Sequence, residues 1–213
     1  MSPRTAAAVR DGGRSLREHL VAAAGRLIAE RGTAGLTVRA IARAAGVADG
    51  VLYNHFADKD ELLAEAWHAH VRAIEDGLPP LPRPGEGTLA DGLRAQIGHG
   101  LALHRAVVPA MSGLLGRPEL LARLNAPRES GVDWRDRLRD WLRAERDLGR
   151  VVPDAPVDAV ASLIVGICHE SVLSMLLRGG DPSAVEPPSG ERLDDLVRAI
   201  LPGLTGTANQ TPS

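Results

Sequence analysis

The segment Val38–Val47, VRAIARAAGV, constrains the fold more than any other part of the chain. Small Ala42 lets a second helix cross the first at close range, and Gly46 supplies the turn residue that tolerates a positive φ. Thr37 is a good N-cap for the first of these helices. The pattern predicts two short helices, the second over Ala48–Asn54, in a helix-turn-helix. Its shared core consists of Ile41, Val47 and Leu52.

The other elements that the sequence predicts are also helices, because no stretch alternates convincingly with a period of two. One helix is expected from Ser15 to Arg31, and another begins at a capping box of Asp58 and Glu61 and ends before the prolines of 79–87. Further helices are expected at about 88–106, 109–116, 118–126, 132–147, 156–178 and 190–204. The predicted fold class is all-α, with an N-terminal three-helix helix-turn-helix domain and a larger helical domain.

Charge is distributed unevenly along the chain. The net charge is only −2, but residues 1–57 hold eight arginines against four acidic residues, so the basic end is the N-terminal end. The single Cys168 cannot form an intrachain disulfide, and the first residues contain no apolar run that would serve as a signal peptide. We therefore expect a cytoplasmic protein.

The apolar stretch Ala159–Leu177 has about the length of a membrane span, roughly 20 residues. It is interrupted by polar groups: Ser162, His169, Glu170, Ser171 and Ser174. These interruptions favour a buried helix of a soluble protein, with no membrane as partner.

Residues Leu36–Leu63, LTVRAIARAAGVADGVLYNHFADKDELL, closely resemble the DNA-binding segment of the tetracycline-repressor (TetR) family. The resemblance covers roughly residues 15–70, and the LYNHF run followed by Lys59 and the ELL of 61–63 is highly characteristic. The remainder matches only in length and helical pattern. The resemblance implies a dimeric, sequence-specific transcriptional regulator, a repressor that a small apolar ligand releases from a palindromic DNA operator.

The resemblance also implies contacts to the DNA backbone. Thr37 and Arg39 meet phosphates at the start of the first helix of the helix-turn-helix. Lys59 anchors a phosphate from the helix that begins after Asp58. Tyr53 and His55 touch the backbone, although the alternative for Tyr53 is a packing role. Hydroxyl and cationic side chains near helix N-termini are suitable phosphate partners.

The recognition helix is expected to present Asp49, Gly50, Val51 and Asn54 to the major groove. Gly50 permits close approach, and Asn54 faces a base. Two positions depart from the family. The family usually has Ser or Thr, as N-cap, where this chain has Ala48, and often a basic residue where it has Asp49. The Asp49 carboxylate either caps or stabilises the N-terminus of the recognition helix, or it accepts a hydrogen bond from cytosine N4 in the groove.

The expected division of the chain is a flexible arm at 1–14, a helix-turn-helix domain at 15–57, an effector-binding and dimerisation domain at 58–204 with a connecting helix at 58–78, and a disordered tail at 205–213. A homodimer is expected because one short recognition helix reads too few base pairs for useful specificity. Its interface should come from the last two helices through Ala159, Ser162, Gly166, Glu170, Leu173, Leu193, Leu196, Val197 and Ile200.

A small-molecule effector is expected because dimerisation alone does not require so many helices between 88 and 147. The predicted pocket residues are Trp67, His70, His104, Met111, Trp134, Trp141 and Cys168. They describe an apolar cavity, which favours a hydrophobic or aromatic ligand and implies no cofactor. Ligand binding would shift the fourth helix, which carries Lys59 at one end and Trp67 in its second half, and so change the separation of the recognition helices.

Three other function classes stand beside a ligand-responsive regulator. An enzyme is disfavoured because the paired histidines, at 68 and 70 and at 99 and 104, point about 200° and about 140° apart on a helix, and the sequence has no HExxH motif or cysteine cluster. A metal-responsive regulator would need these histidines to meet across helices, and no metal site is predicted. A helical dimeric interaction protein with a degenerate DNA-binding domain would explain the unusual Asp49.

Overall fold

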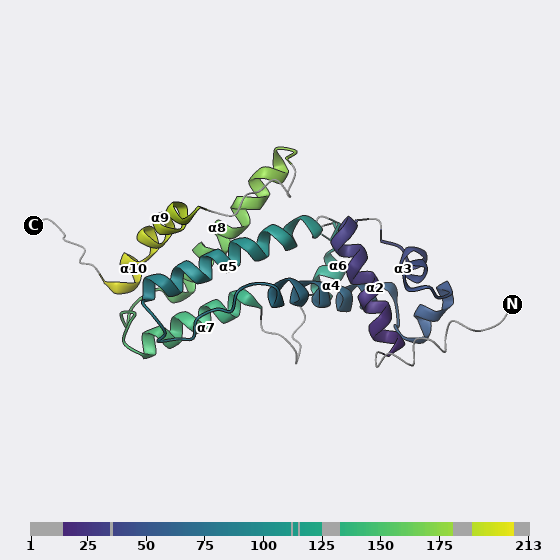
Figure 1. Ribbon diagram of the computed structural model, residues 1–213, viewed down its shortest axis with the longest axis horizontal. Coiled ribbons are helices and arrows are strands. Elements are labelled where there is room, and N and C mark those ends of the chain that lie inside the picture. Colours follow the sequence, from purple (N-terminus) through teal and green to yellow (C-terminus); the bar gives the residue numbers. More distant parts are fainter. Residues whose placement is uncertain are drawn as a thin grey trace, which may run out of the picture. The chain divides into compact units, whose positions relative to one another are not determined.

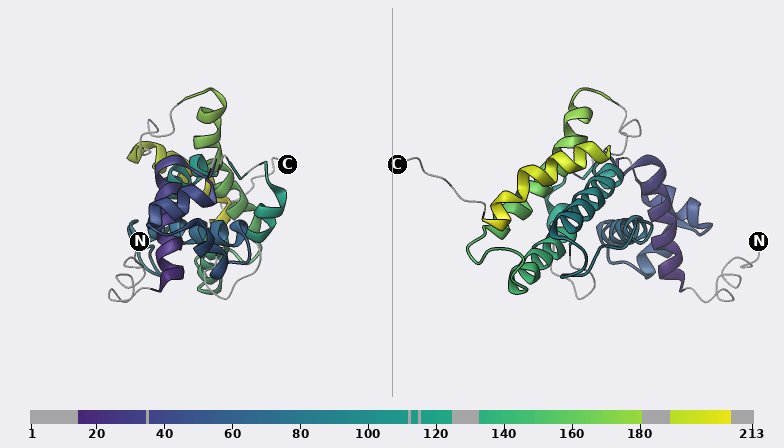
Figure 2. Two further views of the ribbon diagram at one scale, coloured as in Figure 1. Left: turned by 90° about the vertical axis from the view of Figure 1, so that its right-hand side faces the viewer. Right: turned by 60° about the vertical axis from the view of Figure 1, so that its left-hand side comes forward.

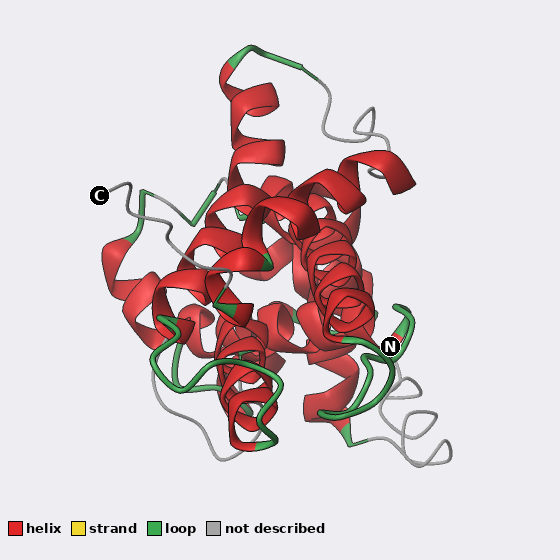
Figure 3. Ribbon diagram, turned by 90° about the vertical axis from the view of Figure 1, so that its left-hand side faces the viewer, coloured by secondary structure: helices red, strands yellow, loops and turns green. Residues whose placement is uncertain are grey.

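The computed structural model describes residues 15–34, 36–111, 113–114, 116–124, 133–180 and 189–206. Every regular element in these ranges is an α- or 3₁₀-helix, as Figure 3 shows. The predicted all-α fold class is therefore confirmed for this part of the chain.

The chain divides into two compact units, which are described separately (Figure 1). Unit 1 comprises residues 1–77 and 107–128, and unit 2 comprises residues 78–106 and 129–213. Helix α5 (Leu89–Ala110) belongs to unit 2 as far as Ala106 and to unit 1 from Val107 onward.

Unit 1 contains the N-terminal helices and one short helix from later in the chain. These are α2 (Leu16–Arg31), α3 (Val38–Ala45), the 3₁₀-helix η2 (Asp49–Asn54), α4 (Lys59–Asp76) and α6 (Pro118–Leu124). Ser15 starts α2 with the full capping box, in which its side chain accepts from the Glu18 backbone and the Glu18 carboxylate accepts from the Ser15 backbone. The core of the unit includes Leu20, Ile28, Ile41, Leu52, Phe56, Leu62, Leu114 and Leu120.

Unit 2 is built from the first eighteen residues of α5 and four later helices. These are α7 (Trp134–Asp147), α8 (Val157–Leu177), α9 (Gly190–Ile200) and α10 (Pro202–Thr205). Helix α9 lies beside α5 (Figure 2), where Asp194 pairs with Arg94. The fully buried Glu145 of α7 accepts from the Gly85 backbone at 3.0 Å and pairs with Arg150 at 3.1 Å, so its charge is compensated.

Two predicted helices near prolines are wrong in their extent. The expected break at 106–109 is absent, and α5 continues through Pro109 to Ala110. The described residues after it, 111, 113, 114 and 116, form turns instead of the predicted helix over 109–116. A proline in the last turn removes only one late hydrogen bond, so the helix tolerates it. The predicted helix at 190–204 is divided at Pro202, which begins α10.

Candidate nucleic-acid interface

The helix-turn-helix has the geometry that its sequence predicts. Gly46 ends α3 in the left-handed conformation, with φ 69° and ψ 29°, and its N–H donates to Ala42 and Arg43 carbonyls. Ala42 is fully buried, and the hydroxyl of Thr37 caps α3 by accepting from the Ala40 backbone at 3.1 Å. The turn therefore positions η2 as the second helix of the motif.

The outer face of η2 consists of the residues that were expected to meet DNA. Tyr53 is 62% exposed, so it is not a packing residue. Asn54 is also exposed, and a Cβ added at Gly50 would meet nothing within 4 Å. Val51 and His55 are half-buried. The open backbone at Gly50 leaves room for a groove to approach η2 closely.

Asp49 lies in the first turn of η2, beside Arg39 of α3. Its Oδ2 is 3.5 Å from the Arg39 Nε, and both side chains are largely exposed. Ala48 provides no side-chain cap, so Asp49 is the acidic group nearest this helix N-terminus. An exposed pair of this kind contributes little in water, so Arg39 remains available to a phosphate.

The start of α4 is held by two arginines from the segment that contains α6. Asp58 caps α4 and makes two contacts of 2.8 Å with Arg123, and Asp60 makes contacts of 2.7 and 2.8 Å with Arg117. The Glu61 backbone N–H, and then Arg123, lower the pKa of Asp58. Lys59 lies between these pairs, and its pKa is lowered by burial and by the nearby Arg117. The anchoring pairs fix the position of the predicted phosphate contact.

Arg17 is a positioning residue that the sequence analysis missed. It donates to the His55 carbonyl oxygen and to Glu65, and to Glu61 at 2.7 Å. Its guanidinium also lies 4.2 Å from the centre of the Phe56 ring. The hydrogen bonds that Arg17 donates to Glu65 and Glu61 raise the pKa of Arg17. The two carboxylates, one turn apart on α4, are the only signal in the sequence that a cation should face them.

Replacing Arg17 by alanine is expected to loosen η2 from α4. The loss of several charge-assisted hydrogen bonds, discounted because the group is about one-third exposed, should cost roughly 2 kcal/mol in the free energy of unfolding. Urea denaturation measures this loss. Arg17→Lys should recover only part of it, because an ammonium cannot reproduce the guanidinium fork. Equal stability of the wild type and the alanine variant would contradict this role.

The predicted pocket residues fall in both units. In unit 2, His104, Trp134 and Cys168 come together around Gly100 of α5. The His104 and Trp134 rings are 5.5 Å apart, and a Cβ on Gly100 would lie 2.2 Å from Trp134 and 2.8 Å from the Cys168 Sγ. Trp141 packs closely against Gly92, which lies two turns before Gly100 on α5, and a Cβ on Gly92 would lie 2.4 Å from the Trp141 ring.

The remaining predicted pocket residues lie in unit 1. The Trp67 and His70 rings of α4 are 6.0 Å apart, and Met111 packs against the unit 1 core. Burial lowers the pKa of His70 and is also the main cause of the lowered pKa of His104 in unit 2. Burial therefore favours the neutral form of both imidazoles.

Burial raises the pKa of the Cys168 thiol to about 12, which makes the stability of unit 2 sensitive to alkaline pH. An unfolded thiol ionises at about pH 8.5, so the stabilising effect of the neutral buried thiol is complete below that pH and is lost as the pH rises toward 12. We expect the free energy of unfolding of the wild type to fall more steeply between pH 8.5 and 10.5 than that of Cys168→Ala. Parallel curves from chemical denaturation would contradict this expectation.

The predicted dimer residues have two different environments. On α8, the exposed residues are Ala159, Ser162, Gly166, Glu170 and Leu173. Leu163 and Leu177, on the same helix, are 61% and 86% exposed. On α9, Val197 and Ile200 are already buried in the chain and Leu193 and Leu196 are half-buried. Helix α8 therefore offers an apolar surface that α9 does not.

Histidines of α5 and α8 lie close together in unit 2. The His104 and His169 rings are 4.5 Å apart, but the described residues contain no group of three or more His, Cys, Asp or Glu side chains able to hold a metal ion. Helix α8 is long and apolar enough to cross a membrane by length and composition, a test that core helices of soluble proteins also pass.

Comparison with known proteins identifies the N-terminal segment. Residues 20–66 match the sequence profile of "Bacterial regulatory proteins, tetR family". The HTH-type transcriptional regulator AcrR of Shigella flexneri is 41% identical over 51 residues, which span 24% of each chain. The sequence match thus spans about a quarter of this relative and coincides with the helix-turn-helix.

Solved structures match over most of the chain. A transcriptional regulator from Rhodococcus sp. Rha1 is 25% identical with a TM-score of 0.60, covering 90% of this chain and 98% of that one. FadR from Bacillus subtilis, solved in complex with stearoyl-CoA, is 20% identical with a TM-score of 0.55, covering 90% and 99%. These similarities establish a fold with an N-terminal helix-turn-helix and a helical remainder.

Proposed function

We propose that the chain, whose residues 20–66 match the TetR-family profile and whose fold resembles that of solved transcriptional regulators, is a cytoplasmic, homodimeric transcriptional repressor that a small apolar ligand releases from a palindromic operator. The observation that carries the proposal is the outer face of η2, where Tyr53 and Asn54 are exposed beside the open Gly50. A helix with this face, held by a well-packed turn, is suited to the major groove.

A gel-shift selection with genomic fragments tests specific DNA binding. At physiological salt and with excess non-specific competitor, the protein should retain a small set of fragments, because specific sites bind about 10³-fold or more tighter than random DNA. Retention of all fragments alike would favour the alternative, an interaction protein with a degenerate DNA-binding domain. In that case the exposed Asp49 carboxylate, which would repel nearby phosphates, is the feature that would weaken binding.

The dimer is proposed to form through the exposed face of α8. Ala159 and Gly166 are small enough to let a second helix approach closely, and Leu163 and Leu173 supply apolar contact. We expect Leu163→Glu to sediment as a monomer at micromolar concentration where the wild type is a dimer. Leu148→Glu, at a similarly exposed leucine outside α8, is the matched control and should remain dimeric.

The effector is proposed to be an apolar or aromatic molecule. The buried aromatic cluster of His104 and Trp134 in unit 2 and the buried Trp67 in unit 1 support this chemistry, because neutral rings favour uncharged ligands. In the stearoyl-CoA of the Bacillus subtilis FadR structure, only the long acyl chain corresponds to such a ligand, because the CoA group is strongly anionic. A tryptophan-fluorescence and thermal-shift screen of apolar metabolites would identify candidates.

Coupling is proposed to run through α4, which begins at Lys59 and carries Trp67 and His70 farther along. A shift of this one helix would change the separation of the two recognition helices, and the duplex fixes the spacing that they must match. A ligand that contacts Trp67 or His70 should therefore weaken operator binding. A ligand that binds there and leaves operator affinity unchanged would exclude this mechanism.

A further inference from the structure

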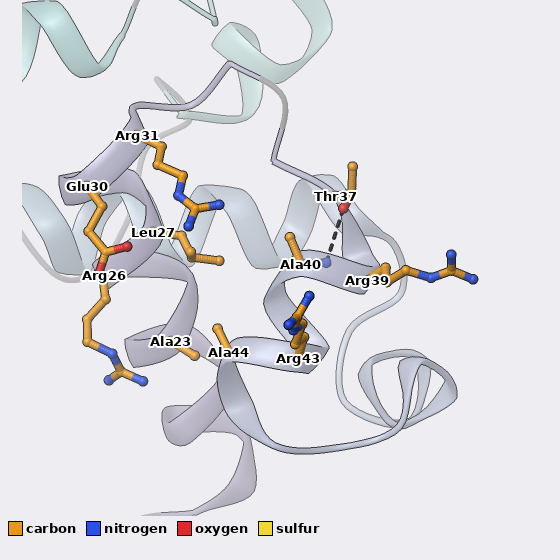
Figure 4. Close-up of a pocket in the computed structure, with 10 residues that line it drawn as sticks. All are labelled: Ala23, Arg26, Leu27, Glu30, Arg31, Thr37, Arg39, Ala40, Arg43 and Ala44. Carbon is orange, nitrogen blue, oxygen red and sulfur yellow. Dashed lines mark hydrogen bonds between the residues drawn. The ribbon is translucent and has the colours of Figure 1, made fainter.

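A basic hollow lies between α2 and α3, beside the residues that were expected to contact DNA (Figure 4). Its lining includes four arginines, Arg26, Arg31, Arg39 and Arg43, and one acidic residue, Glu30. We call this feature the α2–α3 hollow. Such an excess of positive charge on one side of a small domain favours an anionic partner.

The arginines of the hollow are available for a partner. Among the described residues, no ion pair involves Arg26, Arg31 or Arg43, and all three are exposed. By contrast, Arg17 and Arg117 in the same unit each hold a carboxylate. Figure 4 shows Arg31 extending from α2 toward α3, whereas Arg39 points away from the hollow.

The hollow is continuous with the predicted phosphate contacts. Thr37 and Arg39 belong to its lining, and Arg43 follows Arg39 by one turn on the same exposed side of α3. Apart from Glu30, the other lining residues are small or apolar, so they leave room for a sugar-phosphate backbone: Ala23, Leu27, Thr37, Ala40 and Ala44.

We propose that the α2–α3 hollow binds the phosphate backbone of DNA that flanks the half-site, so that each protomer contacts more duplex than its recognition helix reads. This inference rests on the proposed DNA-binding function. Guanidinium groups match phosphate oxygens in pairs, and the continuity with Thr37 and Arg39 favours DNA over an acidic protein segment.

The test compares two operator duplexes, one trimmed to its half-sites and one extended by about ten base pairs, or one helical turn, at each end. The wild type should bind the extended duplex more tightly and with a steeper dependence on salt. The double variant R31Q/R43Q should lose about tenfold in affinity for the extended duplex and less than twofold for the trimmed one. Its salt slope on the extended duplex should fall by about 0.9 for each lost phosphate contact.

Arg72→Gln is the matched control, because Arg72 is an exposed arginine of unit 1 outside the hollow. It should show no dependence on duplex length. Equal affinity of the wild type for both duplexes, or equal losses for the double variant on both, would overturn the inference while leaving specific binding established. Binding of a poly-glutamate peptide that the double variant abolishes, without a length effect on DNA, would assign the hollow to an acidic protein segment instead. Failure to bind either duplex specifically would reject the proposed function itself.

Discussion

Replacing Tyr53 by alanine is expected to remove specific operator binding while leaving the chain folded. The ring is 62% exposed on the outer face of η2, so its loss should leave the core of unit 1 unchanged. Aromatic side chains at the centre of an interface commonly contribute about 2 kcal/mol or more, and we expect a loss in affinity of roughly 30-fold or more. Fluorescence anisotropy with a labelled operator measures this loss, and far-UV circular dichroism should show an unchanged helical signal.

Lys59→Ala distinguishes a backbone contact from base recognition. A phosphate contact should lower affinity by a similar factor for every sequence and reduce the salt slope by about one unit. Tyr53→Phe is the control that separates the hydroxyl group from the ring. Unchanged affinity in both Tyr53→Ala and Lys59→Ala would contradict the assignment of this face to DNA.

Gly100→Ala is expected to destabilise unit 2 strongly. A Cβ at this position would lie 2.2 and 2.6 Å from two atoms of the Trp134 ring and 2.8 Å from the Cys168 Sγ. Both side chains are almost completely buried, so neither can move aside without disturbing its neighbours. Overpacking of this kind costs about 1–3 kcal/mol, which corresponds to a decrease in Tm of roughly 2–4 °C for each kcal/mol.

Gly98→Ala provides a matched control on the same helix. There the added Cβ would make an ordinary contact of 3.9 Å with Leu193, and alanine favours the helix by about 1 kcal/mol. Gly98→Ala should therefore match or exceed the wild-type Tm in differential scanning calorimetry. A Gly100→Ala protein as stable as Gly98→Ala would show that the Trp134 side chain is not confined by Gly100.

The sequence predicts local structure well where short-range chemistry decides it. The caps at Ser15, Thr37 and Asp58, and the turn at Gly46, each depend on residues within four positions, and each forms. The capping box predicted for Asp58 and Glu61 is only half formed, because the Glu61 carboxylate accepts from the Ala57 backbone instead of the Asp58 backbone. The extent of a helix near a proline was less predictable. At Pro109 the helix tolerates a proline in its last turn, which a rule based on interior prolines misses.

Contacts between residues far apart in the chain could not be predicted from the sequence. Arg17 contacts residues 38 to 48 positions away, and nothing in its own surroundings distinguishes it from other surface arginines. Val197 and Ile200 would form the same apolar stripe in the sequence whether they faced a second protomer or the core of their own unit. In the structure both side chains are buried within the chain, so the prediction that they form the dimer interface is not supported. The predicted pocket residues were grouped by side-chain type alone, and the packing of α5 against α7 and α8 decides which of them meet.

Hydroxyl-radical footprinting of a fragment retained in the genomic selection tests the central claim most directly. The proposed homodimer, with one η2 in each protomer, predicts protection related by two-fold symmetry. The two protected half-sites should have centres one helical turn apart, about 10 base pairs, or a multiple of that distance. Tyr53→Ala should lose this pattern at the same protein concentration. Protection without a fixed register, or a single protected site with no symmetry mate, would contradict the account.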